Sequence, residues 1–290
     1  MTITATIIKD SINPFCTRIT TFVLCYPRYL HSEFNTHRMF SRNASSTRAI
    51  PTERQLKAII DDPVYPLIYT SNQKGMQGGA ELPPETIEEI KKEWDAARED
   101  AIKHSRRLAE LGLHKQYAGR ITEPFAHISV ICTATNFDNF FALRRHPDAF
   151  PEIHELADKM YEAMENSIPQ KLEKGQWHLP FVDGIFEATV RNSSKDWQNL
   201  QISLNHSVAC CARVSYKNHD GTSSTPEQDK ELFDRLTGRF PKHSSPLEHQ
   251  AMVANSGKYN KGNFSGGWFQ YRKMFSDECV YKNSPEITNE

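Results

Sequence analysis

The stretch PETIEEIKKEWDAAREDAIKHSRRLAELG, residues 84–112, is the clearest structural element in the sequence. Its apolar residues recur at alternating steps of three and four, which predicts one buried face of an α-helix. Thr86 and Glu89 have the spacing of a capping box after Pro84, and Gly112 follows as a stop. About 26 residues at ~1.5 Å per residue make a helix about 39 Å long. So narrow a stripe predicts packing against another helix, within or between subunits.

The rest of the chain combines strand and helix patterns. β-Branched and alternating segments predict strands at 2–8, 18–26, 249–254 and 264–271, with the first two paired. Helices are predicted over 29–40, 153–168 and 225–238, an irregular loop over 41–48, and a long connection over 61–84. No repeat or linker divides the chain. The sequence therefore predicts one α+β domain over residues 1–290, with long helices packed beside a small mixed or antiparallel sheet.

Composition excludes several classes of protein. The 290 residues contain 35 Lys and Arg against 36 Asp and Glu, so no global field would hold a nucleic acid. No apolar run approaches the ~18 residues of a membrane span, and the first ten residues do not resemble a signal peptide. The six cysteines lack metal or disulfide spacing. We therefore expect a cytoplasmic protein with reduced thiols, no membrane segment and no metal.

Residues 35–48, NTHRMFSRNASSTR, form the first candidate site. Arg38, Arg42 and Arg48 lie among His37, two asparagines and several short hydroxyl side chains. Guanidinium and hydroxyl groups together suit a bound phosphate, because both donate hydrogen bonds to anionic oxygens. A solvated polar loop is the simpler interpretation of this composition.

Residues 243–249, HSSPLEH, form the second candidate site. Two histidines and a glutamate invite a zinc interpretation. However, the spacing does not match a helical zinc motif, and Pro246 interrupts any helix across the set. A turn with polar caps is the alternative.

Arg120 and Arg144 form the third candidate, on either side of the apolar stretch 127–143. Each arginine needs a counter-charge. The partner is either a carboxylate, such as Asp138 or Glu152, or an anionic ligand. Ser46 has no neighbouring base in the sequence, so positioning suits it better than nucleophilic attack.

Four blocks together resemble the flavin-dependent thymidylate synthases, the ThyX family. Thr36-His37-Arg38, then seven residues and Ser46, is similar to the family's Arg-His-Arg-x7-Ser signature. The 243–249 block resembles its second flavin-contacting segment. Residues 211–216, CARVSY, resemble its Ala-Arg-Val-Ser-Tyr segment. The run from Gly119-Arg120 to Glu152-Ile153 is similar to its C-terminal pattern.

The order of these blocks differs from the family's. Residues 1–170 resemble the usual C-terminal portion and residues 200–275 the usual N-terminal portion. The order predicts a circular permutation, which is tolerated where the original termini lie close together. We therefore expect the strand after His249 to lie beside the strand at 18–26.

The resemblance implies reductive methylation of dUMP to dTMP by a homotetramer, with FAD as cofactor and methylenetetrahydrofolate and NADPH as co-substrates. It assigns catalysis to Arg144 and Ser46. It assigns flavin binding to Thr36, His37, Arg38, Asn136, Asn139, Ser215, His243, Ser245 and Glu248. It assigns dUMP binding to Glu33, Ala44, Ser45, Ser46, Thr47, Arg48, Arg120 and Arg144.

Four positions depart from the family pattern. Thr36 replaces an arginine, Ala44 a glutamate, Glu33 a glutamine and Phe150 a glutamine. Arg42 is the candidate to replace the positive charge missing at position 36. These departures keep two alternatives open: a dUMP 5-hydroxymethylase on the same scaffold, and a flavin- or nucleotide-binding protein without turnover.

Overall fold

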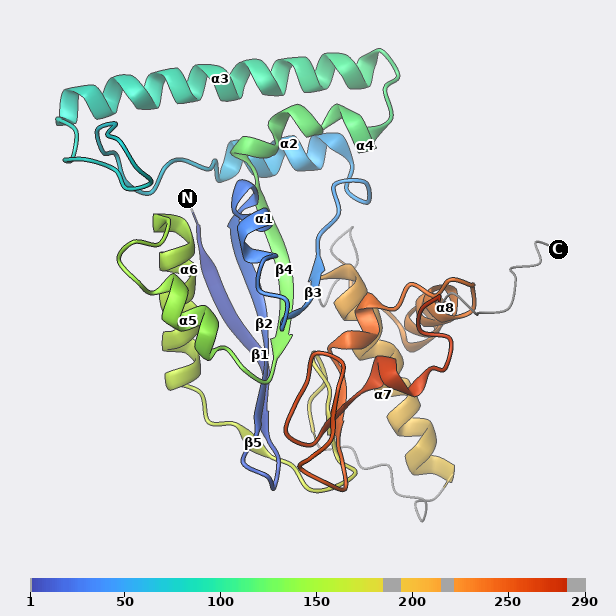
Figure 1. Cartoon of the computed structure of the whole chain (residues 1–290). Helices are drawn as coiled ribbons and strands as arrows, with labels where there is room; N and C mark the ends of the chain where they lie inside the picture. The colour runs from blue at the N-terminus through green and yellow to red at the C-terminus, as the bar shows by residue number, and fades with distance from the viewer. Residues whose placement is uncertain (1, 185–193, 215–221, 281–290) are drawn as a thin grey trace.

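The computed structural model describes residues 2–184, 194–214 and 222–280. A five-stranded sheet lies at its centre (Figure 1). Its strands, in spatial order, are β3 (Ser41–Ala44), β4 (His127–Ala134), β2 (Arg18–Pro27), β1 (Thr4–Ile12) and β5 (Gln170–Lys171). The first four pair antiparallel, and β5 runs parallel to β1. The predicted pairing of the first two strands is confirmed, although β1 extends four residues further than expected.

A smaller second sheet contains the strands from the C-terminal part of the chain. Its order is β6 (Trp177–His178), β7 (Ala251–Val253), β9 (Trp268–Gln270) and β8 (Asn260–Lys261). The strands predicted at 249–254 and 264–271 are confirmed in shortened form. Ile19 of β2 shares a buried cluster with Ala251 and Val253 of β7. The two segments expected to be neighbours therefore pack through side chains from different sheets, and the permutation itself stays a prediction.

The long helix predicted from residue 84 is confirmed as α3 (Pro84–Glu110), of 27 residues. It crosses one end of the molecule above α2 (Thr52–Asp61) and α4 (Lys115–Ala118) (Figure 1). Leu56 and Ile59 of α2 form a cluster with Ile102 of α3. The predicted packing against another helix is therefore confirmed, although the buried position of α3 in this cluster, Ile102, lies outside the predicted stripe. The prediction of a capping box from Thr86 and Glu89 was wrong. Pro83 is the N-cap and has no side-chain capping hydrogen bond, so Thr86 lies inside the first turn.

The helix predicted over 29–40 is much shorter than expected. A 3-10 turn, η1 (Arg28–Leu30), leads into α1 (His31–Phe34), and the chain then turns into β3, where a loop was predicted. Arg42 Nη1 donates to the backbone carbonyls of Phe34, Asn35 and His37, at 3.0–3.4 Å. These carbonyls would otherwise accept bonds from a continuing helix, so Arg42 stabilises the turn that ends α1.

The remaining helices flank the sheets. They are η2 (Arg120–Phe125), α5 (Asp138–Arg144), α6 (Pro151–Glu165), α7 (Ser194–Arg213), α8 (Pro226–Thr237), η3 (Ser245–Glu248) and η4 (Tyr271–Met274). The prediction for α8 is confirmed, with Thr225 and Gln228 forming a capping box. The helix predicted over 153–168 ends earlier, at Glu165. None of the helices in the described ranges combines the length and apolarity that crossing a membrane requires.

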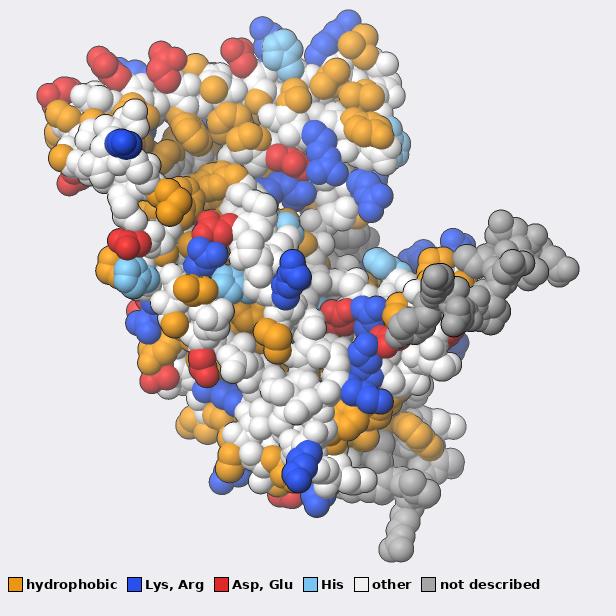
Figure 2. Space-filling view, in the orientation of Figure 1, with side chains coloured by type: hydrophobic (Ala, Val, Ile, Leu, Met, Phe, Trp, Pro, Cys, Tyr) orange, Lys and Arg blue, Asp and Glu red, His pale blue; other side chains and the backbone are white. Residues whose placement is uncertain are grey.

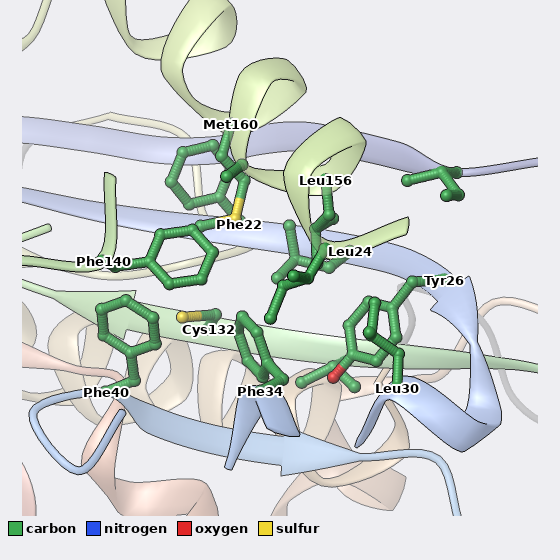
Figure 3. Packing of buried hydrophobic residues seen from close by; sticks show 14 of the residues in the cluster. Phe22, Leu24, Tyr26, Leu30, Phe34, Phe40, Cys132, Phe140, Leu156 and Met160 are labelled. Atoms are coloured by element: carbon green, nitrogen blue, oxygen red, sulfur yellow. The ribbon is translucent and has the colours of Figure 1, made fainter. Parts of the chain in front are cut away.

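The main core lies between one face of the central sheet and α5 with α6. Phe22, Leu24 and Tyr26 alternate along β2 and point to this face, because successive strand residues face opposite sides. Leu156 and Met160 of α6 cover them (Figure 3). The opposite face packs Ile131 against Cys210, Cys211 and Val214 at the end of α7. One face of the sheet thus packs against α5 and α6 and the other against the end of α7, and the edge strand β3 borders both.

Candidate active site

Arg144, Glu33 and His37 form a cluster at the end of α5. The Nη1 of Arg144 makes an ion pair with the Glu33 carboxylate of α1, and its Nε donates to Nε2 of His37 over 3.0 Å. Each of the three was predicted as a site residue. The counter-charge of Arg144 is therefore Glu33, and the prediction of Asp138 or Glu152 for this role was wrong.

Aromatic rings hold this cluster in place. The His37 ring lies 4.9 Å from the ring of Phe140, edge to face, and 5.8 Å from that of Phe40. Burial, followed by the charges of Arg144 and Arg42, lowers the pKa of His37 to about 4. The imidazole is therefore neutral near pH 7, and its Nε2 can accept the hydrogen bond that Nε of Arg144 donates.

Three sequence-distant blocks meet at β3. Asn43 Nδ2 of β3 donates to the backbone carbonyl of Cys211, in the 211–216 block, over 3.0 Å. Gln270 Nε2 donates to Ser41 Oγ of β3 and to the backbone carbonyl of Glu248, each over 3.0 Å. The 35–48, 211–216 and 243–249 blocks therefore lie together, although they are far apart in the sequence.

The pleat of β3 divides the predicted nucleotide-binding residues between two faces. Ala44 packs against the core on the Arg144 side. The neighbouring Ser45 exchanges hydrogen bonds with Ser129 and faces a cavity on the other side, with Thr47. Period-two alternation in an extended chain explains the division. Neighbouring residues of the 35–48 block thus face opposite sides of the sheet.

The cavity beside α2 has a volume of about 420 Å³. Its walls are the sheet at Cys25 and Ser129, the helix α2, and η2 with Gly119. Glu123, in its wall, makes an ion pair with Arg28 Nε at 3.0 Å and accepts a hydrogen bond from Arg120 Nη1 at 2.8 Å. The counter-charge of Arg120 is therefore Glu123, which the sequence analysis did not name.

The other predicted residues occupy several surroundings. The exposed ones are Arg38, Ser46, Arg48, Asn136, Asn139 and His243, and Ser245 is half-buried. Thr36 donates its hydroxyl to the Glu33 carbonyl over 2.7 Å. The Glu248 carboxylate makes an ion pair with Arg272. Ser215 lies outside the described residues. The cavity beside α2 is not lined by Arg144, His37 or any residue of the 243–249 block.

A buried polar chain escaped the sequence analysis. Ser11 contacts Nδ1 of His178 at 3.0 Å, and Nε2 of His178 contacts Thr21 at 2.9 Å. Thr21 bonds to Thr133 at 2.8 Å, and Thr133 bonds to Nδ1 of His249 at 2.9 Å. Burial lowers the pKa of His249 to about 3. No local motif marks these residues, because the chain joins four separate strands and the end of η3.

Glu152 is also buried, and it anchors the long connection before α3. Its Oε1 accepts from the Tyr29 hydroxyl at 3.0 Å and from the backbone N–H of Leu67 at 3.1 Å. The charge of Glu152 raises the pKa of Tyr29 further above the level set by burial. Glu152 thus fixes a loop rather than pairing with an arginine.

Fold and site together define an α+β protein with a cavity on one face of its central sheet and an arginine–carboxylate–histidine cluster on the other. A family model described as thymidylate synthase complementing protein matches residues 10–170, which is more than half of the 290 residues. The chain therefore belongs to this family. No curated protein matches the sequence.

Two solved structures are similar to parts of the chain. One is a UMP/dUMP methylase, PolB, from Streptomyces cacaoi, bound with 5-Br UMP. It is 16% identical with a TM-score of 0.46, over 56% of this chain and 88% of that chain. The other is the same methylase bound with 5-Br dUMP. It is 19% identical with a TM-score of 0.39, over 52% of this chain and 68% of that chain.

Proposed function

We propose that the protein is a flavin-dependent thymidylate synthase, which converts dUMP to dTMP with methylenetetrahydrofolate and NADPH. Membership of the thymidylate synthase complementing family supports an enzyme that modifies dUMP. The observation that carries the proposal is the meeting of three blocks at β3, through Asn43 and Gln270. Motifs that form one site must lie close together, whereas motifs that resemble the family by chance need not.

Arg144 is the proposed electrostatic catalyst. Uracil C5 is a weak nucleophile that strengthens when the ring carries negative charge from N3. A guanidinium beside that edge stabilises the developing anion. Glu33 and His37 fix the direction of the Arg144 fork, so its orientation is set before a ligand arrives. Ser46, which is exposed, is proposed to position the nucleotide.

The exposed polar residues suit a bound FAD. Within the described ranges, Arg38 has no ion pair or hydrogen bond from its side chain, so its charge is available to a diphosphate. Asn136, Asn139 and His243 are exposed and can donate hydrogen bonds. We propose that these residues hold FAD together with Thr36, His37, Ser215, Ser245 and Glu248. When bound, FAD supplies the electrons that reduce the transferred one-carbon unit.

The cavity beside α2 is the proposed dUMP site. Ser45 and Thr47 line it, and Gly119 places Arg120 next to its wall. Arg144 lies on the other face of the sheet and does not line the cavity. We therefore propose that Arg144 of a second copy completes each site, in a homotetramer. Light scattering should then give about four times the 33.3 kDa chain mass.

Release of tritium from [5-³H]dUMP tests the proposal. The purified protein is incubated with the labelled nucleotide, methylenetetrahydrofolate and NADPH, and the mass of the product is measured by mass spectrometry. We expect tritium release and a methylated product. A hydroxymethyl product would replace the synthase with the alternative enzyme. No release from protein that carries FAD would overturn both enzymatic functions.

A further inference from the structure

We propose that Arg54 of α2 binds the phosphate group of the nucleotide in the cavity beside α2, which rests on the proposed function. Arg54 lines this cavity and is exposed. Within the described part of the chain, its side chain takes part in no ion pair or hydrogen bond. An unpaired guanidinium at the wall of a cavity is suited to an anionic group, because it has no competing carboxylate to release.

The other charged side chains of the cavity already have partners. Arg28 is paired with Glu123 at 3.0 Å, and the same carboxylate accepts from Arg120 at 2.8 Å. Asp62 lies 3.6 Å from Nδ1 of His127. Arg54 is therefore the cation of the lining whose charge is not neutralised by a described residue.

Helix α2 places an arginine near one end of the cavity wall and an aspartate near the other. Arg54 lies in the first turn of α2, and Asp62 follows its last residue. Eight residues at ~1.5 Å per residue separate them by about 12 Å along the axis. Arg54 and Asp62 thus lie at opposite ends of this wall, and the phosphate belongs at the Arg54 end, where the guanidinium has no described partner. Figure 2 shows Lys and Arg side chains gathered at the end of the molecule that α2 and α4 occupy.

Calorimetric titration with dUMP and with deoxyuridine tests this role, because the two ligands differ only in the phosphate. The variants are Arg54→Gln, which removes the charge, and Arg54→Lys, which keeps the charge without the fork. Lys57→Ala is the matched control, since Lys57 is on the same helix, is exposed and does not line the cavity. Circular dichroism and melting confirm that each variant is folded.

We expect Arg54→Gln to weaken dUMP binding about 10- to 100-fold and deoxyuridine binding less than about twofold. Arg54→Lys should fall between wild type and Arg54→Gln, and Lys57→Ala should match wild type. Unchanged dUMP affinity in Arg54→Gln, or an equal loss of both ligands, overturns the role of Arg54 alone. A wild-type protein that binds no dUMP overturns the proposed site and this role together. Binding without tritium release overturns only the synthase.

Discussion

Nε of Arg144 donates a hydrogen bond to Nε2 of His37 over 3.0 Å, between residues 107 positions apart in the sequence. A guanidinium only donates, so Nε2 of His37 carries no proton and the ring proton lies on Nδ1. The low pKa of His37, about 4, agrees with this neutral form. The pair therefore fixes both the tautomer of the histidine and the direction of the arginine.

Removing Arg144 should raise the pKa of His37. Burial is the largest cause of its low value and will remain, but the repulsion by Arg144 will be lost. NMR titration of the ring should show a pKa of about 4 in wild type and a higher value in Arg144→Ala. Arg145→Ala, which removes a neighbouring exposed charge, should leave the value unchanged. An unaltered His37 titration in Arg144→Ala would exclude this coupling.

The same shift makes stability depend on pH. The folded pKa of His37, about 4, is below the ordinary value of 6.5, so folding favours the neutral ring. His37 therefore does not reduce the free energy of unfolding above pH 6.5, and it reduces this free energy progressively as the pH falls toward 4. The melting temperature should therefore decline over this range, and less steeply in His37→Gln. His146→Gln is the control, because that histidine is exposed. Equal slopes in wild type and His37→Gln would contradict the prediction.

Loss of Arg144 should also abolish most catalysis. Removing one preorganised donor to a developing anion costs about 10²- to 10³-fold in rate. Tritium release by Arg144→Ala should fall by at least about 100-fold, while bound flavin and its yellow colour persist. Arg145 makes a 2.6 Å ion pair with Asp158 and lies over the Tyr161 ring at 3.8 Å, away from Glu33 and His37. Near-normal activity is expected of Arg145→Ala, and the same result for Arg144→Ala would remove Arg144 from its role.

Phe140 should link core stability to the site. Its ring packs against Phe34 and Phe40 in the main core (Figure 3). It also packs against His37 of the cluster. Phe140→Ala should lower the free energy of unfolding by about 3–5 kcal/mol, as measured by urea denaturation. Leu143→Ala, at an exposed position of the same helix, should change it by less than about 0.5 kcal/mol. A similar effect in both variants would mean that α5 is not anchored by Phe140.

Thr133→Val should break the buried polar chain at its centre. The hydroxyl bonds both Thr21 and Nδ1 of His249, and all three residues are fully buried. Leaving a buried polar group without its partner costs about 1–3 kcal/mol. Thr122→Val is the control, because that hydroxyl bonds only a backbone carbonyl of its own turn, and should cost about 0.5–1.5 kcal/mol. Equal unfolding free energies for the two variants would show that the chain adds nothing.

Local patterns were enough for α3 and α8, but α7, a helix of 20 residues, was not predicted. Period-three and period-four spacing identified α3, and the Thr225–Gln228 box identified the start of α8. The helix predicted over 29–40 was too long, because α1 ends where Arg42 donates hydrogen bonds to three backbone carbonyls. Arg42 lies up to eight residues further along the chain, and these contacts form only after the chain has turned. The counter-charges of Arg120 and Arg144 were also missed, since a sequence lists many carboxylates and does not place any of them.

The amino-acid order by itself determined the helix and strand periods, the family resemblance and the identity of the motif residues, because these depend on neighbours within a few positions. The tertiary structure alone decided that Arg144 meets Glu33 and His37, and that Ala44 and Ser45 face opposite sides of the sheet. Such pairings form only when burial of the apolar faces brings distant segments into contact, and local periodicity contains no record of that contact.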